Sequence, residues 1–233
     1  MEFDTRLIIG LVISVIVILV LRFLIVNVRD YSDKTLSTLT KTDPSLALER
    51  LENNKLLKLI FRKQLLALYK LDCYMSLGKT DEIIKTINLL SSYKLNDYDN
   101  YEFLTKSFSF YLTNNFPEKA KSTYTTTKNF LVNKKISDKE PYANVLEEME
   151  TLIGVYIDKD INLINKLKEK ENKENKKHDK GLIQYRLAKL YYFANNEKKM
   201  NEYLLKAKAN LDDTVYAVII ENALKDNGIL DIK

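Results

Sequence analysis

The sequence contains one cysteine, Cys73, one histidine, His178, and no tryptophan. A single cysteine cannot form an intramolecular disulfide, and these two residues cannot supply the four nitrogen and sulfur ligands of a zinc site. His178 stands in a run of charged residues, so we expect it on the solvated surface, and we expect Cys73 to be a buried, reduced thiol. The sequence therefore offers no Ser–His–Asp or Cys–His catalytic set, and no metal site is expected.

Glycine and proline are scarce, with 5 and 3 residues in a chain of 233. Glycines so few and so scattered cannot build a phosphate-binding loop, and no cofactor is expected. Together with the missing catalytic sets, this predicts that the protein is not an enzyme. Chains with few helix breakers and many Leu, Lys and Glu residues form helices joined by short turns, so the fold class that we predict is all-α.

Charge of either sign shows little excess. The net charge is +5, and acidic residues are interspersed with the lysines along most of the chain. A nucleic-acid-binding surface would gather its basic residues on one face, so no nucleic-acid partner is expected. The densest run, residues 168–180, holds six lysines and four acidic residues. We interpret it as a solvated helix end, because the acids cancel most of the attraction that a basic strip would have for anionic lipid.

One long hydrophobic run stands out, LIIGLVISVIVILVLRFLIV at residues 7–26. About twenty apolar residues in a helix span the hydrocarbon core of a bilayer, and Arg22 lies near one end, where its side chain can reach the headgroups. A buried core helix would not be apolar on every face, and a cleaved signal peptide would have a shorter apolar region followed by small residues. The sequence thus predicts a single transmembrane helix at residues 7–27, with the lipid bilayer as its partner.

Basic residues are more numerous at the end of the predicted span than at its start. Because cytoplasmic flanks carry more Lys and Arg, this asymmetry favours a short outer tail at residues 1–6 and a cytoplasmic soluble domain. An extracytoplasmic domain is the alternative. Arg6 precedes the apolar run, whereas four basic residues lie near or beyond its end: Arg22, Arg29, Lys34 and Lys41.

Residues 28–43 are polar and rich in Ser and Thr, with no sustained apolar period, and we expect them to form a juxtamembrane linker. Asp43–Pro44 then has the pattern of a helix start, because Asp caps free N–H groups and Pro suits the first helical position. The soluble helical domain is expected to occupy residues 44–228, with a C-terminal tail at 229–233.

The soluble part repeats one pattern. A helix with a tyrosine near its end is followed by a turn containing Gly or Asn, then by a second amphipathic helix. Gly and Asn adopt a left-handed backbone most readily, which suits the turn, and small residues on the second helix allow close helix approach. The residues that carry this repeat signature, all expected to be structural, are Leu71, Tyr74, Gly78, Tyr111, Asn115, Ala120, Tyr156, Leu187, Ala188, Tyr191, Asn195 and Ala207.

These units resemble the tetratricopeptide repeat (TPR), which places Leu, Gly or Ala, and Tyr on the first helix, Gly at the turn, and Ala on the second helix. The resemblance covers about 150 residues and implies a short solenoid of helical hairpins. The sequence departs from the family in lacking the Trp and in having Asn at two of the turns. Its tyrosines lie 37, 45 and 35 residues apart, against the 34-residue period of the family, and a generic helical-hairpin solenoid is the alternative.

The function that we predict is a membrane-anchored scaffold, a non-catalytic module that binds another protein or peptide in the groove of the repeats. Exposed tyrosines and lysines of the helices expected at 55–77, 97–114 and 178–194 are the candidate groove residues. The alternative is a structural, self-associating component of a bacterial envelope or membrane assembly. Gly10 and Ser14 form a small-xxx-small pair through which a homo-oligomer could form. The Lys- and Asn-rich composition is typical of a low-GC bacterium.

Overall fold

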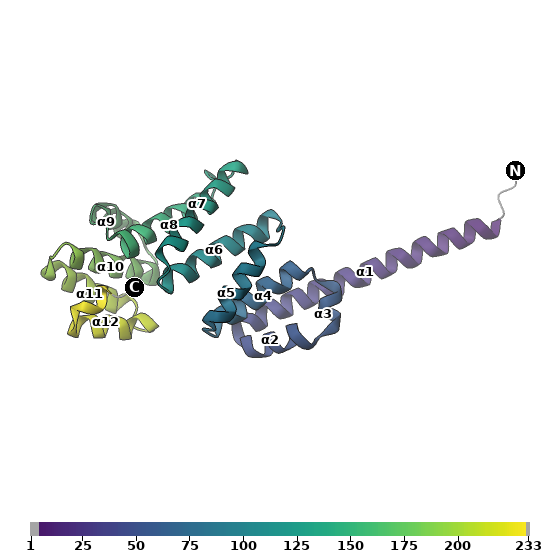
Figure 1. Cartoon of the computed structure of the whole chain (residues 1–233), viewed down its shortest axis with the longest axis horizontal. Helices are drawn as coiled ribbons and strands as arrows, with labels where there is room; N and C mark the ends of the chain where they lie inside the picture. The colour runs from purple at the N-terminus through teal and green to yellow at the C-terminus, as the bar shows by residue number, and fades with distance from the viewer. Residues whose placement is uncertain (1–4, 232–233) are drawn as a thin grey trace. The chain divides into compact units, whose positions relative to one another are not determined.

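The computed structural model describes the backbone of residues 5–231 and the side chains from residue 14 onward. Between residues 5 and 231 the chain is helical and has no strand, which confirms the all-α prediction (Figure 1). It divides into two compact units, Met1–Phe103 and Leu104–Lys233, and the division falls within α6. The elements are α1 Thr5–Thr42, α2 Pro44–Asn53, α3 Lys55–Ile60, α4 Lys63–Ser76, α5 Thr80–Ser91, α6 Asp97–Thr113, α7 Pro117–Asn133, α8 Tyr142–Ile153, the π-helix η1 Gly154–Asp158, α9 Leu163–Lys173, α10 Lys177–Phe193, α11 Glu197–Asn210, α12 Val215–Lys225 and the 3₁₀ helix η2 Asn227–Asp231.

In the first unit, the C-terminal part of α1 packs against α2, α3 and α4. The start of α2 is the expected one: Asp43 Oδ1 accepts a hydrogen bond from the N–H of Leu46 at 2.9 Å, and Pro44 is the first helical residue. These helices share a core cluster of apolar side chains that includes the single cysteine. Its buried members are Leu36, Ala47, Leu51, Leu57, Phe61, Leu66, Tyr69 and Cys73.

The polar segment expected as a linker at 28–43 is instead the second half of α1, which is continuous to Thr42. Its threonine hydroxyls donate to backbone carbonyls one turn back, so they do not compete with the helix; Thr35 bonds to the carbonyl of Tyr31 at 2.9 Å. Leu36 is buried in the core, and the hydroxyl of Tyr69 donates to Asp33 Oδ1 at 2.6 Å. The segment therefore joins α1 rigidly to the first unit.

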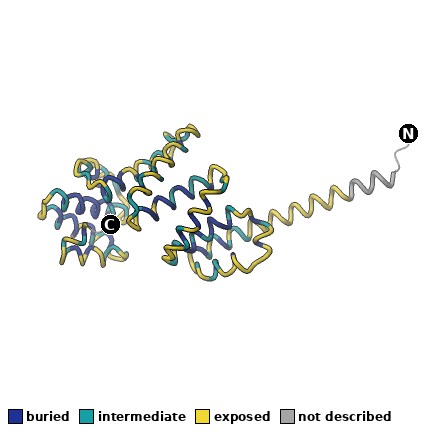
Figure 2. The backbone as a smooth tube through the Cα atoms, viewed as in Figure 1, coloured by how far each residue is buried: buried dark blue, intermediate teal, exposed yellow. Residues whose placement is uncertain are grey.

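The side chains of residues 14–30 are all exposed, including an unbroken run of large apolar residues (Figure 2). In the part of the chain that the structure describes, no helix meets the combined length and hydropathy required to cross a membrane. The predicted span begins at residue 7, but the side chains of residues 1–13 lie outside the described part of the chain. The structure therefore describes the side chains of the predicted span only from residue 14 to residue 27.

In the second unit, α10 is the central helix and packs against α9, α11 and η2. It is buried on nearly all sides between Gly181 and Tyr191, which explains why its sequence shows no clear apolar stripe. The segment expected as a C-terminal tail at 229–233 is ordered as far as Asp231, and Leu230 is fully buried. The last two residues lie outside the described part of the chain.

Candidate functional site

The three turn residues of the repeat signature share one backbone geometry. Gly78, Asn115 and Asn195 have φ angles of 64°, 60° and 54°, the left-handed conformation expected of them. In each case the carbonyl of the preceding tyrosine accepts a bond from the N–H five residues on: Lys79 to Tyr74 at 3.0 Å, Phe116 to Tyr111 at 2.9 Å and Asn196 to Tyr191 at 2.9 Å. The backbone carbonyls of these tyrosines thus take part in ending the first helix of each pair.

Two further left-handed residues end helices in the second unit, and sequence reasoning missed both. Lys135 follows α7 with a φ of 56°, and the N–H of Ile136 bonds to the carbonyl of Leu131 at 3.1 Å. Lys159 follows η1 with a φ of 54°. Lysine gives no sequence signal for this conformation, because it lacks the conformational freedom of Gly and the short polar side chain of Asn.

The side chains of the repeat signature are structural. Their tyrosines are at most 9% exposed in α4, α6 and α10, and the ring of Tyr191 stacks on that of Tyr203 with centroids 5.5 Å apart. Tyr156 lies in η1, where the pattern is most degenerate. The remaining positions of the signature are fully buried: Leu71, Ala120, Leu187, Ala188 and Ala207.

The turn geometry gives a first prediction. A Cβ added at Gly78 would meet nothing within 4 Å, so Gly78→Ala tests the backbone conformation alone. We expect the free energy of unfolding to fall by about 1 kcal/mol, the cost of placing alanine in the left-handed region. Gly78→Asn should lose less than half as much, because Asn tolerates this region, as it does at Asn115 and Asn195. Thermal unfolding followed by circular dichroism measures both; equal losses would contradict the explanation.

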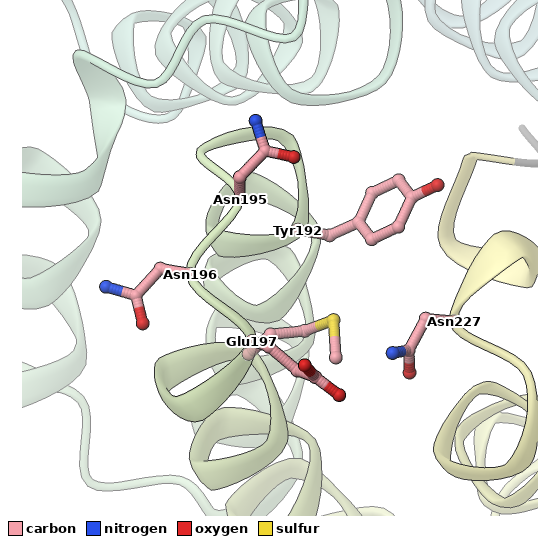
Figure 3. Close-up of a pocket in the computed structure, with 6 residues that line it drawn as sticks. Tyr192, Asn195, Asn196, Glu197 and Asn227 are labelled. Carbon is pink, nitrogen blue, oxygen red and sulfur yellow. The ribbon is translucent and has the colours of Figure 1, made fainter.

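A small hollow lies beside the turn between α10 and α11 (Figure 3). Its volume is about 230 Å³, and it offers amide groups and a single carboxylate. Asn196 is already used as a cap, since its Oδ1 accepts a bond from the N–H of Lys199 at 3.1 Å, and in Figure 3 its side chain points away from Tyr192 and Asn227. The lining residues are Tyr192, Asn195, Asn196, Glu197, Met200 and Asn227. This hollow is too small and too weakly charged for a specific ligand site.

A larger hollow of about 480 Å³ lies among α7, α8, η1 and the start of α9. Its wall carries lysines and carboxylates together, and two of these, Lys121 and Asp158, form an ion pair at 2.7 Å. A wall that carries charges of both signs is better suited to bind a ligand with both charge signs, such as a peptide, than to bind an anion. Its charged residues are Lys121, Glu150, Asp158, Asp160 and Lys166.

A charged network around the buried Arg186 lies where α8, α9 and α10 meet. Arg186 pairs with Glu148 at 2.6 Å, and Lys170 pairs with the same carboxylate at 3.1 Å. Burial alone would raise the pKa of Glu148, but the two cations outweigh it and hold this pKa below its usual value. Burial raises the pKa of Tyr156, whose hydroxyl bonds to Arg186. The network orients α10 against α8, and each of its charged groups is already paired.

Lys189 belongs to the helix expected at 178–194, whose exposed lysines are candidate groove residues, but it does not face a groove. It is only 2% exposed, its Nζ donates to the carbonyl of Leu230 at 2.6 Å, and it lies 5.1 Å from the centre of the Tyr156 ring. The burial of Lys189 could not be predicted from the sequence of α10, because its charged and apolar residues alternate and other elements surround the helix. Lys189 therefore holds the C-terminal segment in place.

The burial of Lys189 gives a second prediction. Burial lowers its pKa to about 8, so the folded state binds fewer protons than the unfolded chain above that pH. The free energy of unfolding should rise by about 1–2 kcal/mol between pH 8 and roughly pH 9.5, since an unfolded lysine titrates near 10.4. Above pH 10 the buried tyrosines oppose this gain, because burial raises the pKa of Tyr185 to about 12.

Denaturant unfolding at the two pH values measures this effect. The matched variant is Lys189→Met, which keeps the length of the side chain and removes the titrating group. We expect the variant to show a flat profile across the same window. A rise of the same size in the variant would show that another group causes it.

Among residues 14–231, no group of three or more His, Cys, Asp or Glu side chains is placed to hold a metal ion. Comparisons of the chain with protein-family models, with curated proteins and with solved structures give no match. The most unusual surface that remains is the exposed apolar part of α1, from Val15 to Val28, whose large side chains are 41–67% exposed. An apolar surface of this extent on a protein marks contact with a partner or with lipid.

Proposed function

We propose that the chain is a single-pass membrane protein that holds a helical protein-binding module against the bilayer. The observation that carries the proposal is the exposed apolar surface of α1, which has no polar side between Val15 and Leu21. Residues 7–27 as a helix would measure about 31 Å, the thickness of the hydrocarbon core. The basic residues past this segment favour a cytoplasmic module.

The structure supports a protein-binding module built from TPR-like hairpins. The α4–α5 and α10–α11 pairs pack closely and share the same left-handed turn. Such pairs use their surfaces to bind peptides and proteins in other repeat arrays. The hollow among α7, α8 and η1 is where we expect a peptide with both charge signs to bind. Tethering such a module raises the effective concentration of its partner at the membrane.

Self-association is the second candidate function, and α12 favours it. Its outer face exposes Val215 at 78% and Val218 at 62%, and Leu205 on the neighbouring α11 is 58% exposed. Light scattering of a chain from residue 28 to 233 tests it, since this chain keeps the buried part of α1. A dimer that becomes monomeric with Val215→Lys and Val218→Lys supports self-association through α12, and a monomeric parent chain excludes it.

The test of the anchor is extraction of membranes from cells that express the full chain. We expect the protein to stay with the membrane in alkaline carbonate and to float with reconstituted vesicles. The matched control is the chain from residue 28 to 233, which should be released. Protease added to intact cells should spare the module if it is cytoplasmic. Release of the full chain by carbonate would overturn the proposal.

A further inference from the structure

A short amphipathic helix, α3, lies at the end of the first unit from which α1 projects (Figure 1). Its inner face packs in the core through Leu57, next to the buried Phe61. Its outer face exposes Leu56 at 51% and Leu59 at 82%. Among the large hydrophobic side chains that the structure describes, Leu59 is the most exposed, more so than those of α1. Exposing an apolar side chain of this size to water is unfavourable in free energy, and such a side chain often marks a contact with a partner surface.

The chain segment that contains α3 is basic. Between Glu52 and Asp72 the chain has five basic residues and no acidic one. Lys55 and Lys58 alternate with the two exposed leucines on the outer face of α3, and Arg62 and Lys63 begin α4 next to it. Lysines flanking leucines on one helical face are typical of helices that lie in the headgroup layer of an anionic membrane, with the apolar side chains below and the ammonium groups above.

Exposed tyrosines flank the same end of the unit. Tyr31, on α1, is 74% exposed and lies four residues beyond the predicted span. The ion pair of Arg62 with Asp99, at 3.2 Å, holds the start of α6 beside the start of α4, which brings Tyr98 to this end with 73% of its surface exposed. Tyrosine is enriched at the level of the lipid headgroups, where its ring is half immersed.

The distance along α1 fits this placement. Leu36, which belongs to the same core cluster as Leu57 and Phe61, lies nine residues after the end of the predicted span at residue 27. At 1.5 Å per residue this is about 14 Å of helix, so the near end of the unit reaches the headgroup layer without any bend in α1.

From these observations we infer that α3 and the residues around it form a second membrane contact, a surface that binds the anionic headgroups of the same bilayer that holds α1. This inference rests on the proposed membrane anchor. The contact surface consists of Leu56, Leu59, Lys55, Lys58, Lys63 and Tyr98. It fixes the tilt of α1 and of the first unit on the membrane.

Fluorescence of the full chain in lipid vesicles tests the contact. An environment-sensitive, thiol-reactive fluorophore is attached at Leu59→Cys, and its quenching by spin-labelled lipid is measured with and without the anionic lipid phosphatidylglycerol. Ser45→Cys is the matched control, since Ser45 is exposed at the opposite end of the unit. Leu19→Cys reports insertion of α1. The native Cys73 should take up little label, because it is buried and burial raises the pKa of its thiol to about 11.

We expect lipid quenching at positions 19 and 59 and none at position 45. Each lysine held near an anionic surface contributes a factor of about five in affinity, so Lys55→Glu with Lys58→Glu should abolish the quenching at 59 in anionic vesicles. Lys41→Glu with Lys79→Glu changes the net charge equally at the far end and should leave it intact.

Three outcomes distinguish failure of the contact surface from failure of the membrane anchor. Quenching at 19 without quenching at 59 overturns the contact surface and leaves the anchor standing. A blue shift at 59 without lipid quenching does the same, and shows that a protein covers α3. Absence of quenching at 19, with vesicles that float without the protein, overturns the anchor and the contact surface together.

Discussion

Three aspartates in the middle of the apolar run, Val15→Asp, Val17→Asp and Leu19→Asp, should release the protein from membranes. Seventeen of the twenty residues at 7–26 are Leu, Ile, Val or Phe, which together favour insertion by roughly 5–10 kcal/mol. Each aspartate near the centre opposes insertion by about 3 kcal/mol and also removes an apolar contribution. The sum reverses the sign of the insertion free energy, and the variant is expected in the carbonate-soluble fraction.

The matched control, Val15→Leu with Val17→Leu, keeps the native Leu19 and should remain in the membrane. A single Val17→Asp variant should also stay inserted, because the rest of the run outweighs one charge. Circular dichroism of the released variant in solution shows whether the helical module is intact. Retention of the triple aspartate variant in carbonate-washed membranes would mean that something other than the apolar run holds the protein there.

Glu148→Gln is expected to have the largest effect on folding stability in the second unit. The variant leaves the buried Arg186 without the carboxylate that lies 2.6 Å from it. Breaking a fully buried ion pair costs about 3–5 kcal/mol, and because the side chain of Glu148 is 36% exposed we expect about 2–3 kcal/mol. Urea unfolding of the full chain in mild detergent measures the loss.

The neighbouring residue supplies the control. Glu147 pairs with Lys166 at 3.1 Å, but both side chains are nearly half exposed, so Glu147→Gln should cost less than about 0.5 kcal/mol. The pKa of Glu148 is held below its usual value, so its contribution is full above the pKa of an unfolded glutamate, near 4.3, and is lost as the pH falls further. The difference between wild type and Glu148→Gln should therefore shrink in acid. Equal losses at the two positions would contradict the buried network.

The sequence predicted helix starts and ends well where these depend on a few adjacent residues. Asp43 and Pro44 favour a helix start through their own side chains, and Gly78, Asn115 and Asn195 end helices because they tolerate the left-handed backbone of the turn. The segment at 28–43 was predicted wrongly as a linker. Its threonines indicate a loop when considered alone, and only the core formed by α2 and α4 gives Leu36 a buried place that favours the helix.

The sequence could not predict which charges are buried. In the sequence, Arg186 and Lys189 stand among apolar residues in the same way as charged residues that face solvent. They are buried only because α10 packs between α9, α11 and η2. Burial depends on the neighbouring residues, and these lie as far as 41 residues away along the chain: Glu148 contacts Arg186, and Leu230 contacts Lys189. The exposure of Leu59 could not be predicted for the same reason, since its helix has apolar residues on both faces.

By itself, the sequence determined the helical class, the apolar run near the N-terminus and the turns that close the hairpins, because each follows from the conformational preference or hydropathy of a few adjacent residues. Only the tertiary structure decided that α1 continues into the first unit, that α10 carries its charges inward, and that α3 turns Leu59 outward beside α1. These features depend on which helices meet, and the free energy of that packing is shared among residues distant in the chain.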